Sequence, residues 1–286
     1  MAQIKEIKGR IKSVKYVQQI TKAMKLVSAA KLRKSETRFH YFKEYLHKQD
    51  HIASFMQTKN LWNKTFLTKP KENVTKKGYV VFSGDKGFCG SFNSNVFKKA
   101  VKEIKNNNQN EVKIIGVGKN VNILFERNNY ELLLDIRDVF GQVSFKHARN
   151  LSNEIFKFYE EDKFDELYLI YNRFKPKNEE SIAVIPLIPM PINILKNITH
   201  ESDYLYEPGI QSFMDNFITN YFILRLYYYL LESEAAEFLA RMTSMDSATN
   251  NATELINTLT LDYNRARQAI ITKEILDIVG GAEALK

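Results

Sequence analysis

The sequence contains one cysteine, Cys89, among 286 residues. A single cysteine cannot form an internal disulfide, and it cannot supply a multi-cysteine zinc site. The sequence also lacks a run of about 18 to 20 uncharged apolar residues, the length that a helix needs to cross a bilayer. Its first residues do not include the apolar core of a secretory signal. We therefore expect a soluble intracellular chain.

Glycine and proline are absent from residues 10–69 and 210–279, whereas all six prolines and eight of the eleven glycines lie from 70 to 209. Because these two residues interrupt regular structure most strongly, the sequence predicts a long helix at each end and a mixed domain between them. We accordingly predict an N-terminal coiled-coil helix over 1–69, a central α/β domain over 70–208 and a C-terminal coiled-coil helix over 209–286. The C-terminal helix would be about 105 Å long, too long to fit inside a compact domain of its own.

Both end segments carry apolar residues at the three–four spacing of a coiled coil. In the C-terminal segment the alternation is unbroken and includes Met242, Met245, Thr249, Ala252, Ile256, Leu259, Tyr263, Ala266 and Ile270. In the N-terminal segment the candidate positions are Ile4, Ile7, Ile11 and Val14, followed by Val17, Ile20, Met24 and Val27. The two N-terminal sets join at a spacing of three where four would continue the repeat, which predicts a local stammer. We expect the two helices to pack as an antiparallel coiled coil.

The middle segment alternates strand and helix patterns. The candidate strands are Tyr79–Phe82, Val112–Val117, Glu131–Ile136, Leu167–Asn172 and Ile182–Ile188, and the candidate helices are Asn93–Lys105, Asn120–Arg127 and Phe145–Tyr159. Strands separated by helices of this length indicate a largely parallel sheet. The predicted fold class is therefore α/β, with a central Rossmann-like domain and a long antiparallel coiled coil of the terminal helices.

The charge of the chain is unevenly distributed. The formal net charge is +9, but residues 1–43 contain twelve lysines and arginines against two glutamates, so the remainder of the chain is close to neutral. A basic block of this kind typically faces a polyanion, which could be nucleic acid, an anionic membrane surface or an acidic protein. A solvated helix face is the simpler alternative, and the charge by itself does not distinguish among these four.

The sequence stays apolar beyond Ile270, through Ile275, Leu276 and Val279 to Leu285. A free helix end in water is usually polar and frayed. An apolar end on a long helix instead indicates that another protein surrounds it.

Candidate catalytic and ligand-binding residues are few. The loop 83–91 follows the first predicted strand, where an α/β fold can bind phosphate or carry a nucleophile, but its glycines have the spacing G-x-x-G-x-x-G. Cys89 lies in this loop without a nearby histidine, and a buried cysteine is more often a packing residue. His47 and His51 could share a metal, although a polar helix surface explains them better. We predict no catalytic residue, no cofactor site and no metal site.

Several segments together resemble the gamma subunit of the rotary (F-type) ATP synthase. They are QQITKAMKLVSAAKLR at 18–33, DKGFCG at 85–90, Tyr204–Pro208, ARMTSMDSATNNA at 240–252 and YNRARQAIITKEI at 263–275. These segments lie at both ends and in the middle, so the resemblance covers the full length.

The resemblance implies a central rotor shaft that couples ion-driven rotation of a membrane ring to ATP synthesis or hydrolysis, and that regulates ATPase activity and proton flow. The implied partners are a hexamer of alpha and beta subunits, the epsilon and delta subunits and the membrane c-ring, with one copy of the shaft per complex. The implied location is peripheral, on the cytoplasmic face of a bacterial inner membrane. The chain itself would be non-catalytic, with the nucleotide sites on the beta subunits.

The resemblance also implies roles for individual residues, taken position by position from the matching motifs. Contacts to the beta subunit and sensitivity of coupling are expected at Met24, Arg241, Arg267, Gln268 and Thr272. The side facing the rotor ring and epsilon subunit is expected to include Tyr204, Tyr206 and Glu207. A position in the coiled-coil seam remains an alternative explanation for Met24.

The main alternative function is that of a basic coiled-coil protein that binds nucleic acid. The basic block would suit such a protein, but it contains few aromatic residues for base stacking and no base-reading motif. The apolar C-terminal end distinguishes the two hypotheses, because a nucleic-acid-binding arm has no need of it.

Overall fold

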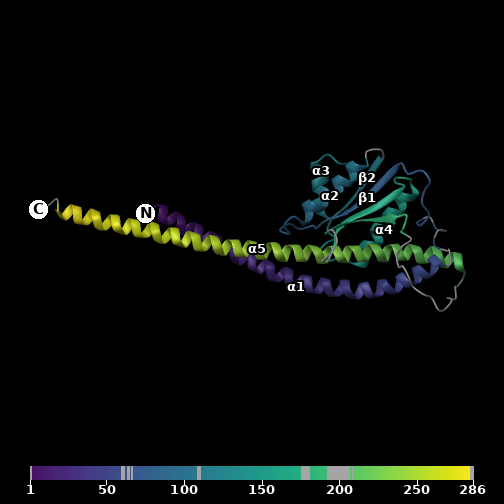
Figure 1. The fold of residues 1–286 in the computed structure, drawn as a ribbon, viewed down its shortest axis with the longest axis horizontal. Helices are drawn as coiled ribbons and strands as arrows, with labels where there is room; N and C mark the ends of the chain where they lie inside the picture. The colour runs from purple at the N-terminus through teal and green to yellow at the C-terminus, as the bar shows by residue number, and fades with distance from the viewer. Residues whose placement is uncertain are drawn as a thin grey trace. The chain divides into compact units, whose positions relative to one another are not determined.

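The structure, a computed structural model, describes residues 2–58, 62, 65, 67–107, 111–174, 181–191, 207 and 209–283 (Figure 1). Two compact units form. The paired-helix unit contains residues 1–30 and 241–286, and the sheet unit contains residues 31–240. The helices α1 (Ala2–Thr58) and α5 (Ile210–Glu283) each contribute to both units. The division into three domains by residue range stays a prediction, whereas the mixed fold class with two long terminal helices is confirmed.

The paired-helix unit is an antiparallel pair. Gln18 Nε2 donates to Thr253 Oγ1 at 2.7 Å, the hydroxyls of Thr21 and Thr249 lie 2.8 Å apart, and Lys25 Nζ contacts Asp246 at 2.6 Å. Residue numbers therefore rise along α1 as they fall along α5. The predicted positions of α5 from Met242 to Ile270 are all buried or half-buried, as expected for a seam.

The predicted stammer in α1 is wrong. Val17, Ile20 and Val27 are 52%, 59% and 57% exposed and face away from α5. The seam instead continues the three–four spacing beyond Val14, through Gln18, Thr21, Lys25 and Ser28, which are half-buried or buried. A continuous helix keeps its facing stripe in register whatever residues occupy it. The prediction chose apolar residues outside the seam because the seam itself is polar over this stretch.

The sheet unit is built on five strands, β1 (Lys76–Phe82), β2 (Glu111–Val117), β3 (Leu134–Ile136), β4 (Glu166–Asn172) and β5 (Ile182–Ile188), with order β3-β2-β1-β4-β5. The first four strands are parallel, and β5 pairs antiparallel with β4. Pro186 is tolerated because β5 is an edge strand with one unpaired side. The predicted, largely parallel sheet is confirmed.

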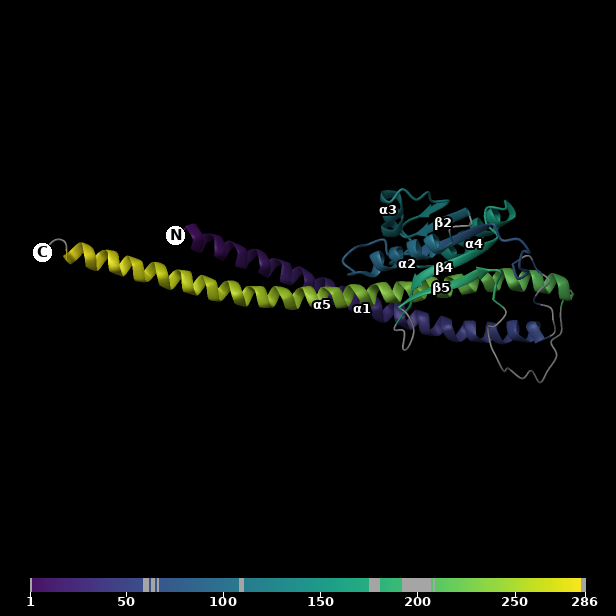
Figure 2. The same cartoon turned by 45° about the horizontal axis from the view of Figure 1, so that its top comes forward.

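Helices cover both faces of this sheet (Figure 2). The helices α2 (Phe92–Asn106) and α3 (Lys119–Arg127) pack on one face, where Val96 and Phe125 join Tyr79 and Ile114 in one apolar cluster. On the other face lie α4 (Phe145–Glu160) and the part of α5 within the sheet unit, so that Tyr171 of β4 meets Tyr229 of α5 at 5.3 Å between ring centroids.

Within the sheet unit α5 is buried on nearly all sides. Every residue from Tyr229 to Phe238 is buried. This stretch includes three glutamates, Glu232, Glu234 and Glu237, which are among the residues least often buried in proteins unless they are paired. A helix surrounded on all sides is apolar throughout except where a polar side chain has a partner.

No helix among the described residues has an uncharged apolar stretch sufficient to span a bilayer.

Candidate functional site

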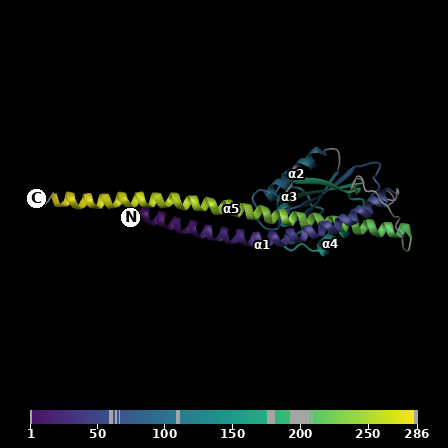
Figure 3. The ribbon, with the colours of Figure 1, turned by 60° about the horizontal axis from the view of Figure 1, so that its bottom comes forward.

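The part of α5 that follows the paired region carries three of the residues singled out from the sequence. When the pairing of Thr21 with Thr249 is continued at the same register, the first residue of α1, Ala2, falls opposite Gln268. In the paired-helix unit α5 consequently runs past the start of α1, which all three views show (Figure 3). Arg267, Gln268 and Thr272 are exposed on this stretch.

Large apolar side chains accompany them. Ile271, Ile275, Leu276, Ile278 and Val279 are 40% to 72% exposed. A cluster of this kind on one helix end is unfavourable in water and is typical of a surface that a partner covers. The end of α5 therefore combines an apolar surface with the hydrogen-bonding groups of Arg267 and Gln268.

A second exposed apolar surface lies on α1. Its members are the outward-facing residues Tyr16, Val17, Ile20, Leu26 and Val27, which are 52% to 63% exposed. They alternate with exposed basic residues such as Lys12, Lys15 and Lys22. Reasoning from the sequence assigned three of these apolar residues to the seam. Continuing the three–four spacing from Val14 without regard to polarity would have placed these three residues outside the seam.

The remaining predicted partner residues have different surroundings. Met24 is half-buried beside the seam residue Lys25, and Arg241 is only 7% exposed. Glu207 is exposed, whereas Tyr204 and Tyr206 lie outside the described residues. The structure therefore brings Arg267, Gln268 and Thr272 together on one exposed helix end, and it places Met24 and Arg241 elsewhere.

The glycine-containing loop 83–91 is tied to two neighbouring loops through the side chain of Asp85. The carboxylate of Asp85 accepts hydrogen bonds from the backbone nitrogens of Lys119, Asp138 and Phe140 at 2.8, 3.0 and 2.7 Å. Cys89 is 3% exposed, as expected for a packing residue. In the part of the chain that the structure describes, no group of three or more metal-ligating side chains is found.

The carboxyl edge of the sheet carries two buried carboxylates from α5. Glu232 accepts hydrogen bonds from the hydroxyl of Tyr171 at 2.7 Å and from the backbone nitrogen of Phe174 at 3.3 Å. Burial nevertheless raises the pKa of Glu232 above its usual value, and burial likewise raises the pKa of Tyr171. Glu234 accepts hydrogen bonds from the backbone nitrogens of Gly141 and Val143 at 3.2 and 3.1 Å.

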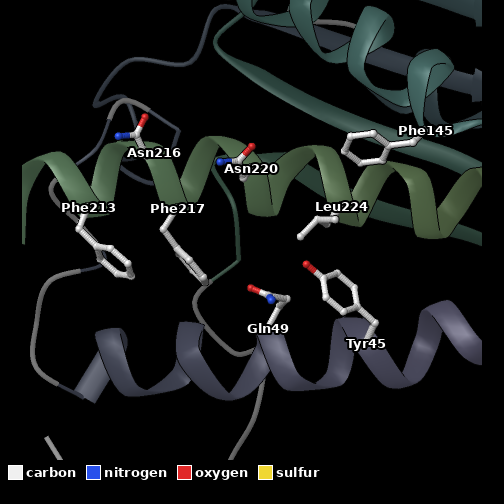
Figure 4. Close-up of a pocket in the computed structure, with 8 residues that line it drawn as sticks. All are labelled: Tyr45, Gln49, Phe145, Phe213, Asn216, Phe217, Asn220 and Leu224. Carbon is white, nitrogen blue, oxygen red and sulfur yellow. The ribbon is translucent and has the colours of Figure 1, made fainter. Parts of the chain in front are cut away.

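A groove of about 400 Å³ lies between α1 and α5 within the sheet unit (Figure 4). Its lining is uncharged and includes Tyr45 and Gln49 from α1 and Phe217 and Leu224 from α5. Figure 4 shows the Tyr45 hydroxyl and the Gln49 amide directed toward α5. The polar groups that line it are the Tyr45 hydroxyl and the side-chain amides of Gln49, Asn216 and Asn220.

Comparison with known proteins gives one consistent family. A family model described as ATP synthase matches residues 3–285. The ATP synthase gamma chain of Chloroherpeton thalassium is 37% identical over 303 residues, which cover 100% of this chain and 99% of that relative. The ATP synthase gamma chain of Staphylococcus aureus is 37% identical over 290 residues, covering both chains completely.

Solved structures agree with these relatives. A chain in the central stalk and c-ring structure of the Tetrahymena thermophila mitochondrial ATP synthase is 26% identical, with a TM-score of 0.60 over 80% of this chain and 99% of that one. A chain in the rotor of the Euglena gracilis mitochondrial ATP synthase has the same fold, with a TM-score of 0.68 over 94% of this chain and 99% of that one at 20% identity. From the matched length and the identity to the bacterial relatives, we conclude that the chain belongs to the family of ATP synthase gamma chains.

Proposed function

We propose that this chain is the central rotor shaft of an F-type ATP synthase, which couples rotation of a membrane ring to ATP synthesis or hydrolysis on other subunits and so regulates ATPase activity and proton flow. The observation that carries the proposal is the end of α5, which is apolar, exposed and extends past α1 in a chain that belongs to the gamma family. The family assignment leaves the nucleic-acid hypothesis without support.

The proposed partners follow from these surfaces. The end of α5 after Gln268 would turn inside a hexamer of alpha and beta subunits, with Arg267, Gln268 and Thr272 forming hydrogen bonds to a beta subunit. The basic helix α1 would face acidic loops of beta, where long-range attraction suits a shaft that meets several beta subunits in turn. Coupling would be sensitive to substitutions at Met24 and Arg241.

A second group of residues is proposed to contact the membrane sector. Tyr204, Tyr206 and Glu207 would face the c-ring and epsilon subunit, and delta would be a further subunit of the same complex, with one copy of this chain in each. The chain would be a non-catalytic peripheral subunit on the cytoplasmic face of a bacterial inner membrane. Its own residues would act by presenting different contacts to each beta subunit, which is the requirement for driving those subunits into different states.

Reconstitution tests this proposal. The purified chain is mixed with alpha and beta subunits from the same source, and the products are analysed by size-exclusion chromatography and ATPase assay. We expect one large complex whose ATPase activity depends on this chain, and a less stable complex with a chain truncated after Ile270. A chain that stays out of the complex and instead shifts DNA or RNA in a salt-dependent way would overturn the proposal.

Point variants test the contact residues separately. Arg267→Ala and Gln268→Ala remove exposed groups, so the isolated chain should unfold at an unchanged temperature while the chain-dependent ATPase activity falls. Arg265→Ala is the matched control, because it removes the same charge from an exposed position about 200° around the helix from Arg267. Equal loss of activity in the variants at 265 and 267 would point to a general effect of charge and would argue against a specific contact at Arg267.

A further inference from the structure

Parallel sheets commonly bind anionic ligands just beyond the carboxyl ends of their strands, where backbone N–H groups of the connecting loops are available. In this chain α5 supplies carboxylates to that edge. Glu232 binds the end of β4 through Tyr171 and the segment after it through the backbone nitrogen of Phe174. Glu234 binds the loop after β3 through the backbone nitrogens of Gly141 and Val143.

The loop after β1 meets a carboxylate as well. A Cβ atom added to Gly84 would lie 2.6 Å from Oε1 of Glu237, so the absence of a side chain at Gly84 allows this close approach. Glutamates within six residues of α5 thus reach the loops after three strands. They occupy the region in which such a sheet would otherwise bind an anionic ligand.

Glu234 also binds α1. Its Oε1 accepts the two backbone hydrogen bonds of the loop, while its Oε2 accepts a hydrogen bond from Ser35 Oγ at 3.1 Å and lies 3.6 Å from the Arg38 guanidinium. Arg38 in turn donates to the carbonyl of Val143 in the same loop. One side chain, 2% exposed, therefore joins α1, α5 and the sheet.

These bonds differ in kind from the surrounding packing. Contacts between apolar side chains are non-directional, whereas charge-assisted hydrogen bonds to backbone groups fix both distance and angle. When a force acts on the sheet, the sheet should slide least against the two helices where charge-assisted hydrogen bonds join it to both of them.

We propose that Glu234 is a positioning residue for energy coupling: it holds the sheet to both long helices, so that torque passes between the part of the rotor on the membrane ring and the part inside the hexamer. This inference rests on the function proposed above. It assigns to Glu234 a mechanical role in which the carboxylate takes the place of a bound anion.

The test compares Glu234→Gln with wild type in the complete complex, reconstituted with its membrane sector in vesicles. The readout is the ratio of ATP-driven proton uptake to ATP hydrolysed. A glutamine amide cannot accept from all of its present partners at once, so its NH2 group must face either Arg38 or the backbone donors. We expect the ratio to fall by at least about twofold, because a joint weakened by lost charge-assisted bonds can slip.

Asp165→Asn is the matched control. Asp165 also accepts two backbone hydrogen bonds, from Thr75 and Lys76, and also pairs with a cation, Lys71, but these partners lie on neither α1 nor α5. A merely structural defect should therefore lower stability in both variants, and only Glu234→Gln should lower the ratio. Arg38→Met, which removes the guanidinium from the same joint, should lower the ratio in the same direction and serves if Glu234→Gln does not fold.

The outcomes separate this inference from the function on which it rests. A wild-type complex that hydrolyses ATP without proton uptake would contradict the proposed function. A wild-type complex that pumps, together with Glu234→Gln or Arg38→Met variants that pump equally well per ATP, would overturn the role of Glu234. An equal loss in Asp165→Asn would overturn it too, since destabilisation would then explain the effect.

Discussion

Asp165 illustrates how single buried carboxylates hold the sheet unit together. It connects the start of β1 to the start of β4 through hydrogen bonds from the backbone nitrogens of Thr75 and Lys76, both at 2.9 Å, and an ion pair with Lys71 at 3.0 Å. Burial raises the pKa of this carboxyl group, but the hydrogen bonds from Thr75, Lys71 and Lys76 outweigh burial and lower its pKa to about 2. The ionised form is therefore the one that stabilises the fold.

The pH dependence of this stabilisation is a first prediction. Because the pKa is about 2 in the folded state against 3.8 for a free side chain, the stabilisation is complete above about pH 5 and is lost as the pH falls toward 2. Asp165→Asn should lower the free energy of unfolding by about 2 kcal/mol at pH 7. Urea denaturation at pH 7, 4 and 3 should show the difference from wild type shrinking with acidification. A difference that stays constant over this range would contradict the assignment.

Two glycines with nearly the same backbone angle provide a second prediction. Gly118 and Gly141 have φ of +104° and +106°, but a Cβ at Gly118 would lie 2.0 Å from the carbonyl oxygen of Ser83, whereas one at Gly141 would meet nothing within 4 Å. Gly118→Ala should cost more than about 3 kcal/mol or prevent folding, because the clash adds to backbone strain, and Gly141→Ala should cost about 1 kcal/mol. Thermal unfolding of both variants measures the difference. Similar losses of stability would show that the backbone angle alone, and not the clash with Ser83, sets the cost.

At the scale of elements, the paired helices have an unusual distribution of polarity. Between Val14 and Ser28 the seam of α1 is polar, and the large apolar residues Val17, Ile20 and Val27 face outward. Polar seam residues specify register at a cost in stability. The pairs of Gln18 with Thr253 and Lys25 with Asp246 suit that role, because a shift by one position along either helix would separate them.

This arrangement predicts opposite behaviour for two neighbouring apolar residues. Ile20→Ser should change the free energy of unfolding of the isolated chain by less than about 0.5 kcal/mol, because Ile20 is 59% exposed. Val14→Ser, at a half-buried seam position, should cost about 1 kcal/mol. Chemical denaturation of the isolated chain gives both values. In the reconstituted complex we expect the opposite order, with Ile20→Ser weakening assembly more than Val14→Ser. A large loss of stability from Ile20→Ser in the isolated chain would instead place Ile20 in the seam, as the predicted stammer required.

The two units differ in how far the sequence predicts them. The strands and helices of the sheet unit were predictable because runs of Val, Ile and Tyr between glycines and charged turns indicate buried strands. The seam of α5 was predictable because it is apolar almost throughout. The seam of α1 was not, since after Val14 the residues that face α5 are largely polar and the large apolar residues lie outside the seam.

The joint at Glu234 was equally inaccessible from the sequence. Nothing in the spacing of Arg38, Val143 and Glu234 relates them, because they lie on α1, on a loop after β3 and on α5. By contrast, the exposed position of Arg267 and Gln268 could be anticipated, since both flank the seam residue Ala266 on a regular helix. Local periodicity predicts faces, while partners distant in sequence emerge only with the fold.

At the scale of the whole molecule, the proposed function is rotation within a larger complex. The described residues form no metal-ligating cluster, and carboxylates from α5 bind the carboxyl edge of the sheet. What the chain offers is an exposed apolar helix end, a basic outer face on α1 and a sheet unit joined to both long helices. Those features suit a part that moves as a body while other subunits bind nucleotide.

The most direct measurement is to watch the chain turn. The hexamer of alpha and beta subunits is fixed to a surface, and a bead is attached to the sheet unit through a cysteine introduced by Lys102→Cys. Position 102 is exposed on α2, so its thiol should react with the bead far faster than that of Cys89, which is 3% exposed. On addition of ATP we expect steady rotation of the bead in one direction, with three pauses in each turn, one for each beta subunit. A bead that stays still while the same complexes hydrolyse ATP would contradict the central claim.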